Sequence, residues 1–295
     1  MIRSLLTVAL LAQLEAAPAR AEELSVRGTV IDIRPTPDDS VSPAARQWIE
    51  NSAKAVATYY GGIPVKRVVL RVTTTNGRKA RNGRAGDDGG LSVDISVGRE
   101  ATNATLADDW ILTHEMLHLC FPSVPQKSHW LEEGISTYVE PFARARAGLI
   151  TPEAAWAGLV EGAPEGQPRE GDRGLDNTHT WGRTYWGGAI FCLRADVEIR
   201  KRTGNKKGLE HALRAIAVGG GTLDKFWKLD QVIAVGDGAT GVPVLRELYD
   251  EMKGQPVTVD LAGLWKELGV EIRGKSAVFH DDAPLAGIRK AITAP

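Results

Sequence analysis

Two histidines and a glutamate near the middle of the chain have the spacing of a metal-dependent hydrolase. His114, Glu115 and His118 form the pattern HExxH. Residues i and i+4 lie on one face of a helix, so both imidazoles can bind a single zinc ion with bonds of about 2.0–2.1 Å. Glu115 lies between them and can accept a proton from water at such an ion. The motif predicts a zinc site with Glu115 as general base; the alternative is two structural histidines on a core helix.

A hydrolytic zinc site needs a third protein ligand and one position left for water. The segment WLEEG, residues 130–134, follows the HExxH motif and offers two adjacent carboxylates, Glu132 and Glu133. Neighbouring residues on a helix point about 100° apart, so only one of the two can face the ion. Position along the helix does not decide between them.

The metal motif is expected on the first of several helices. That helix is predicted from about Leu106 to Cys120, and a second begins near Glu132. A linker rich in glycine, proline and charge is predicted over residues 158–177. Further helices are predicted over about 184–202, 207–218, 242–253 and 260–268.

The N-terminal part has the alternating pattern of a small sheet. Short strands are predicted at 24–26 and 29–33, followed by a helix from Pro43 to about Tyr60. Residues 66–75 and 91–97 are predicted as the two strands of a hairpin, whose loop carries four cations between Arg78 and Arg84.

These elements predict an α+β fold. A small mixed α/β part with an edge strand, residues 22–100, precedes a mainly helical part, residues 101–254. Together they form the predicted catalytic domain, and residues 255–295 are predicted as a C-terminal extension.

Composition and the first residues bear on compartment and partners. The chain has 36 Lys and Arg against 37 Asp and Glu, which argues against binding to nucleic acid or to an anionic membrane surface. Arg3, an apolar stretch over 5–14 and the small residues around Arg20 predict a signal peptide over 1–21, cleaved before Glu22. We therefore expect an exported protein, periplasmic or extracellular, without stable membrane insertion. The alternative is an N-terminal helix that is retained.

The two cysteines, Cys120 and Cys192, are too few for a disulfide framework or a cysteine-built zinc site. In an oxidising compartment they can pair, or they can remain as two buried thiols. The sequence does not decide between these states.

HExxH followed by W-L-x-E-G resembles the gluzincin metallopeptidases, in particular the aminopeptidase N and glycyl aminopeptidase groups. In those proteins the glutamate directly before the glycine is a zinc ligand, which implies that Glu133 completes the site. The 14 residues between His118 and Glu133 are a shorter connection than aminopeptidase N relatives have.

A second segment, YWGGA at 185–189, resembles the Y-x-x-G-A segment of the glycyl aminopeptidase group. In these families the tyrosine donates a hydrogen bond to the oxyanion of the tetrahedral intermediate, and the resemblance implies this role for Tyr185. The resemblance covers residues 89–217, nearly half of the chain.

The chain also departs from those families. Aminopeptidase N relatives have a G-x-M-E-N strand whose glutamate binds the free amino group of the substrate. The comparable segment here, 89–94, has Ser92 in that place, and Asp94 is only a weak substitute. The strand can still pair with an extended peptide. Thr137 replaces the aspartate that orients a ligand in thermolysin-like enzymes, so the histidines must be oriented by other residues.

The sequence therefore predicts zinc-dependent hydrolysis of peptide bonds, with one zinc ion per chain and a peptide or protein as substrate. The choice between endopeptidase and aminopeptidase stays open, as does the oligomeric state. One alternative is a non-catalytic zinc-binding domain that binds peptides or proteins, and another is a fortuitous zinc site in a structural scaffold. His129 and His179 could approach the cleft, but each is predicted to be an ordinary surface or loop histidine.

Overall fold

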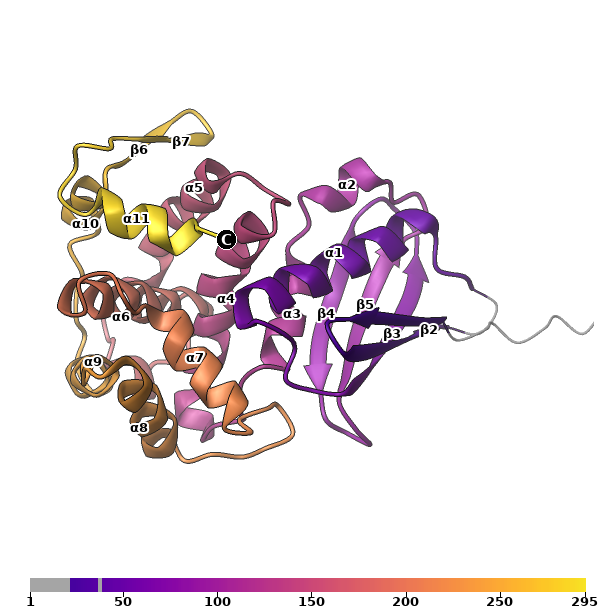
Figure 1. Ribbon diagram of the computed structural model, residues 1–295, viewed down its shortest axis with the longest axis horizontal. Coiled ribbons are helices and arrows are strands. Elements are labelled where there is room, and N and C mark those ends of the chain that lie inside the picture. The colour runs from indigo at the N-terminus through magenta and orange to yellow at the C-terminus, as the bar shows by residue number, and fades with distance from the viewer. Residues whose placement is uncertain (1–21, 37–38) are drawn as a thin grey trace, which may run out of the picture.

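A computed structural model describes residues 22–36 and 39–295. The predicted signal peptide, residues 1–21, lies outside the described residues. A sheet and its covering helices form one side of the molecule, and the helices from α4 onward form the other (Figure 1). The predicted α+β class is confirmed.

The N-terminal sheet has five strands. Their spatial order is β1 (Glu22–Val26), β2 (Thr29–Pro35), β3 (Arg67–Thr75), β5 (Ser92–Gly98) and β4 (Ala80–Gly86). Strands β2, β3 and β5 are parallel, whereas β1 is antiparallel to β2 and β4 is antiparallel to β5. The strands β1 and β4 are therefore the two edges.

Helix α1 (Pro43–Tyr60) connects the parallel strands β2 and β3 and covers one face of the sheet (Figure 1). Ser42 caps it by accepting a hydrogen bond from the Ala45 N–H at 3.1 Å, and Gly61 ends it with a φ of 85°. Its buried face includes Ile49 and Val56, which join the buried residues of the strands in one core.

The predicted hairpin over 66–97 was wrong. Its two strands, β3 and β5, are parallel neighbours, and the predicted loop contains the antiparallel edge strand β4. The register of β4 shifts between Arg81 and Arg84, and Asn82 has a φ of 53°. This bulge and the charged, glycine-containing composition hide the strand from a search for alternating apolar residues.

The strand expected to pair with substrate is therefore interior, since β5 is bonded to β3 on one side and β4 on the other. The Asp94 carboxylate lies 3.3 Å from an Arg71 guanidinium nitrogen. Asp94 is thus already paired, and the free edge beside the helical part is β4.

The predicted helix over 106–120 is two helices, α2 (Asn103–Ala107) and α3 (Ile111–His118). Between them the Asp109 carboxylate accepts a hydrogen bond from the Ile111 N–H at 3.0 Å, which starts a new helix rather than continuing the first. Helix α4 (His129–Arg146) begins earlier than predicted, after a short 3-10 turn over 126–128.

The helical part continues through the rest of the chain. Its elements are α5 (Pro152–Gly162), α6 (Gly188–Arg202), α7 (Leu209–Val218), α8 (Leu229–Thr240), α9 (Val244–Met252), α10 (Leu261–Leu268), the hairpin β6 (Val270–Arg273) and β7 (Ser276–Phe279), and α11 (Ala286–Thr293). Helix α5 occupies the first residues of the predicted linker. Within the described residues, no helix has the length and apolar character needed to cross a membrane.

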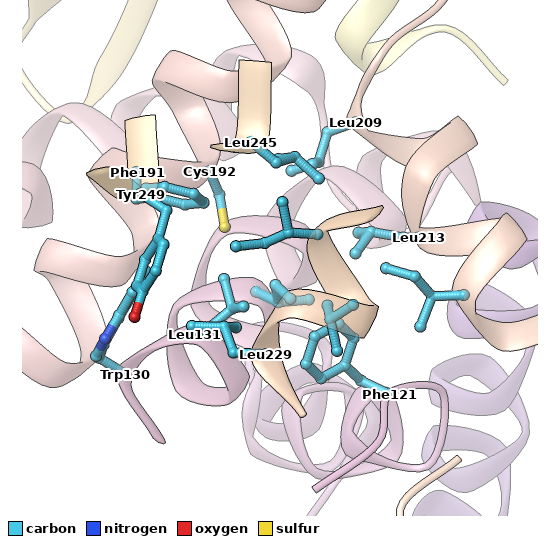
Figure 2. Close-up of a pocket in the computed structure, with 14 residues that line it drawn as sticks. Phe121, Trp130, Leu131, Phe191, Cys192, Leu209, Leu213, Leu229, Leu245 and Tyr249 are labelled. Carbon is cyan, nitrogen blue, oxygen red and sulfur yellow. The ribbon is translucent and has the colours of Figure 1, made fainter. Parts of the chain in front are cut away.

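Apolar side chains from α4, α6, α7, α8 and α9 meet in the interior of the helical part (Figure 2). Trp130 and Leu131 of α4 line this region together with Cys192 of α6. Both cysteines, Cys120 and Cys192, are buried free thiols. The segment predicted as an extension packs against α4 at another place, where the Arg146 Nε donates to the Ile292 carbonyl at 2.9 Å.

Helices α4 and α6 cross at two glycines. A Cβ added to Gly134 would lie 2.3 Å from the Gly188 Cα, and one added to Gly188 would lie 2.1 Å from the Trp130 carbonyl oxygen. These contacts are with backbone atoms, which cannot move aside without moving a helix. A glycine is therefore required directly after Glu133.

We expect Gly134→Ala to lower the free energy of unfolding by about 1–3 kcal/mol, because the new methyl group overpacks the crossing. The measurement is urea denaturation followed by circular dichroism. Gly158→Ala is the matched control: this exposed residue of α5 has nothing within 4 Å of an added Cβ. The control should gain about 0.5–1 kcal/mol from its better helix propensity. Equal stability of Gly134→Ala and wild type would contradict the close crossing.

Candidate metal centre

Helices α3 and α4 bring the three predicted ligands together. The Glu133 Oε2 lies 3.1 Å from the His114 Nε2 and 3.6 Å from the His118 Nε2. The donor atoms of the three residues all lie within 4.8 Å of one another. Their exposed fractions are only 4%, 9% and 8% for His114, His118 and Glu133.

This donor set fits a metal ion. A tetrahedral ion with bonds of about 2.0–2.1 Å places its ligand atoms about 3.3 Å apart, close to the two distances between the carboxylate oxygen and the imidazole nitrogens. Glu132 points elsewhere, since its Oε1 accepts a hydrogen bond from the Val124 N–H at 2.8 Å. Of the two adjacent glutamates, it is therefore Glu133 that faces the histidines.

The electrostatics of the cluster favour a cation. Burial acts to raise the pKa of Glu133, but hydrogen bonds with three imidazoles, those of His114, His118 and His129, hold it well below its usual range. For His118, burial acts to lower the pKa, but the neighbouring Glu133 carboxylate raises it overall. The Glu133 carboxylate thus stays ionised, and its negative charge stabilises positive charge beside it, either a proton on His118 or a metal ion.

Ser136, rather than Thr137, contacts a predicted ligand. The Ser136 Oγ lies 3.4 Å from the His118 Nδ1, so the Nδ1–H can donate to it and leave the Nε2 free as a ligand. The Thr137 Oγ1 is buried without a hydrogen-bond partner.

The preferred prediction for His129, an ordinary surface histidine, was wrong: the alternative holds, because this residue lies at the site. Its Nε2 is 3.3 Å from the Glu133 Oε1, and its Nδ1 is 3.3 Å from the Glu132 Oε2. Hydrogen bonds to Glu132 and Glu133 raise the pKa of His129 to about 10. The i, i+4 spacing to Glu133 was the available signal, but it has meaning only if the helix starts at His129. His179 is exposed, as predicted.

The edge strand β4 holds Glu115. The Ala85 N–H donates to the Glu115 Oε2 at 2.9 Å. A Cβ added to Gly83 would lie 2.7 Å from the Glu115 Cγ and 2.5 Å from the Ile111 Cγ2. Strand β4 therefore approaches α3 closely and fixes one carboxylate oxygen of Glu115, so that the other remains to accept a proton.

Tyr185 lies against the same cluster. It belongs to a π-helical turn over 183–187, and its ring stacks on that of His114 with centroids 6.1 Å apart. Burial, followed by the charges of Glu133 and Glu115, raises the pKa of Tyr185 to about 12. The phenol thus stays protonated at neutral pH and can donate a hydrogen bond.

The π-helical turn is held by its neighbours. The Arg183 Nε lies 2.7 Å from the buried Asp172 carboxylate. A Cβ added to Gly162 would lie 2.0 Å from the Trp186 ring, so the indole packs directly on the α5 backbone. Residues on both sides of Tyr185 are therefore fixed. A π-helical turn of this kind is frequent at functional sites.

Asp176 is a positioning residue that the sequence did not reveal. Its carboxylate accepts hydrogen bonds from the Trp130 Nε1 at 2.8 Å, the Tyr249 hydroxyl at 2.8 Å and the Ser128 Oγ at 3.3 Å. These bonds join the start of α4, which carries His129 and Glu133, to α9. Because the partners are distant in sequence, no local pattern marks the residue.

Comparisons with known proteins bear on the fold. No protein-family model matches the chain, and no curated protein matches it. Among solved structures, it is similar to an aminopeptidase N family protein from Idiomarina loihiensis, with a TM-score of 0.62 and 15% identity over 86% of this chain and 50% of that one. It is also similar to an M1 zinc metallopeptidase from Deinococcus radiodurans bound to a Tyr-Ser-Ala substrate, with a TM-score of 0.53 and 14% identity over 82% of this chain and 53% of that one.

The chain thus spans about half the length of these solved structures. The similarity extends over both the sheet and the helical part, well beyond the HExxH motif. The predicted resemblance is confirmed at the level of the fold: the chain has the gluzincin-like fold of the M1 and aminopeptidase N metallopeptidases.

Proposed function

We propose that this protein is a zinc-dependent peptidase with one zinc ion per chain. One observation carries the proposal: three buried ligand atoms, a carboxylate held beside them and a protonated tyrosine converge on a single site. Two imidazoles and one carboxylate are a typical ligand set of catalytic zinc, which leaves a further position for water or substrate. In this proposal His114, His118 and Glu133 hold the ion.

When bound, zinc lowers the pKa of a water molecule to about 7 and polarises a substrate carbonyl group. Glu115 accepts the proton of the attacking water on its free oxygen and then passes it to the leaving amine. The hydrogen bond from the Ala85 N–H keeps the carboxylate in place during both transfers.

Tyr185 stabilises the negative charge that develops on the carbonyl oxygen. Its pKa of about 12 keeps the donor proton on the phenol. The free edge of β4 lies beside Glu115 and is the place where the backbone of an extended substrate can pair. The substrate is thus a peptide or an extended segment of a protein, rather than a nucleic acid or a membrane.

Export is a further part of the proposal and rests on residues 1–21 alone. If it is correct, the protein recovered from the periplasm or the medium starts near Glu22. Recovery of the uncleaved chain from the cytoplasm would contradict it.

The catalytic proposal is tested by digestion of a mixed peptide library, with cleavage read by mass spectrometry. We expect Glu115→Gln to lose about 10²–10⁴-fold in rate with its zinc content unchanged, because it removes the base but no ligand. Tyr185→Phe should lose about 10²–10³-fold. His114→Ala should lose the zinc itself.

Peptides with blocked N-termini separate the two peptidase classes, since only an aminopeptidase requires the free amine. If zinc-loaded wild type cleaves no peptide, the non-catalytic peptide-binding alternative takes precedence. Unchanged metal content in His114→Ala would instead indicate that the predicted site does not hold the ion.

We expect His129→Ala to weaken zinc binding by about 10–100-fold, because it frees the Glu133 Oε1 that His129 holds in place. Competition with a chromophoric chelator measures the affinity without reference to activity. His129→Gln, which retains a donor, should recover part of the loss. His179→Ala is the control, since this histidine is exposed, and equal losses in both variants would refute a specific role for His129.

A further inference from the structure

Two exposed tryptophans lie beside the candidate metal centre. The large apolar side chains that are exposed among the described residues include Trp110 at 50% and Trp181 at 62%. Leaving an indole in water forgoes much of the free energy that its burial supplies. Exposed aromatic groups beside a site are therefore typical of binding surfaces.

The two indoles extend the site in two directions. The Trp110 ring lies edge-on to that of His114, with centroids 5.4 Å apart and an interplanar angle of 79°. The Trp181 ring stacks on that of Tyr185 at 5.9 Å and 27°. Tyr185 in turn stacks on His114, so the four rings form a continuous series with the predicted ligand and the predicted oxyanion donor in its middle.

Neither tryptophan is required by the local fold. Trp110 occupies the N-cap position of α3 but makes no side-chain capping hydrogen bond there, and a small polar residue serves that position better. Trp181 precedes the π-helical turn and is mostly exposed. The turn itself is held by contacts of two of its own residues, Arg183 and Trp186.

The apolar region in the helical part does not serve the same purpose. It is lined by core side chains such as Leu131, Cys192 and Leu213, and none of the four aromatic rings of the series lines it. These residues lie in the closed interior (Figure 2). An apolar substrate side chain near the metal centre can therefore contact the exposed indoles, but not the buried side chains of this region.

We infer that Trp110 and Trp181 are specificity-determining residues that bind aromatic or large apolar side chains of the substrate next to the scissile bond. The inference rests on the proposed peptidase function and adds a substrate class to it. An indole face offers stacking and apolar contact to such side chains, and it offers little to serine or aspartate.

The test uses two series of peptides that differ only in the residues flanking one bond, with Phe, Leu, Ser or Asp in each place. One series has blocked N-termini and is varied at the central bond, and the other has free N-termini and is varied at the first bond. Binding is measured on zinc-loaded Glu115→Gln protein, and turnover on wild type. We expect Phe and Leu peptides to bind at least tenfold more tightly than Ser or Asp peptides. Trp110→Ala and Trp181→Ala should each raise Kd and KM for the Phe peptides about tenfold, with less effect on kcat and on the Ser peptides.

Trp181→Phe should restore most of the affinity, because it retains an aromatic face. Phe226→Ala is the matched control, since Phe226 is 68% exposed and is no part of the ring series. It should leave Kd and KM unchanged.

The outcomes separate this inference from the catalytic proposal. Tryptophan-dependent binding of Phe peptides without cleavage of either series would support the inference and overturn the peptidase. Cleavage without preference at the flanking residues would support the peptidase and overturn the inference. Equal losses for Phe and Ser peptides in the tryptophan variants would show a structural role. If a soluble N-acetylglucosamine oligomer binds in a tryptophan-dependent manner and peptides do not, the indoles bind saccharide and the inference is overturned.

Discussion

The contact between Gly134 and Gly188 determines the geometry of the whole site. Because neither residue has a side chain, α4 and α6 cross at backbone distance. Glu133 directly precedes one glycine, and Tyr185 lies one turn before the other. The crossing therefore brings a predicted metal ligand and a predicted oxyanion donor to the same place. Helix α3 completes the cluster with its two histidines.

The buried charge of the Glu133 carboxylate explains why several side chains are arranged around it. A carboxylate buried among imidazoles is costly unless each oxygen is bound. The two histidines of α3 surround the Glu133 Oε2, and His129 lies at its Oε1. Glu132 in turn binds both His129 and the Val124 N–H. Hydrogen bonds in the first turn of α4 thus hold the Glu133 carboxylate in a single orientation, as a metal ligand must be held.

Local spacing was enough to predict part of this site. His114, Glu115 and His118 are positioned by the period of one helix, and the sequence identifies them without tertiary information. Glu133 required the resemblance to known metallopeptidases, because periodicity alone left Glu132 open. His129, Ser136 and Asp176 act through contacts that depend on where α4 begins and what packs against it. Apart from the i, i+4 spacing of His129 and Glu133, no pattern of residue types marks those contacts.

The edge strand β4 shows why the largest error in the predicted fold, the hairpin over 66–97, falls beside the site. Strand β4 lacks alternating apolar residues because one side lies in solvent and the other meets α3 at Gly83. Its Ala85 N–H donates to Glu115 instead of to a neighbouring strand. The bulge at Asn82 and the exposed cations Arg81 and Arg84 also discourage edge-to-edge association, to which a regular free edge is prone. The features that obscure the strand in the sequence are those that let it hold Glu115, the predicted general base, while β4 remains at the edge of the sheet.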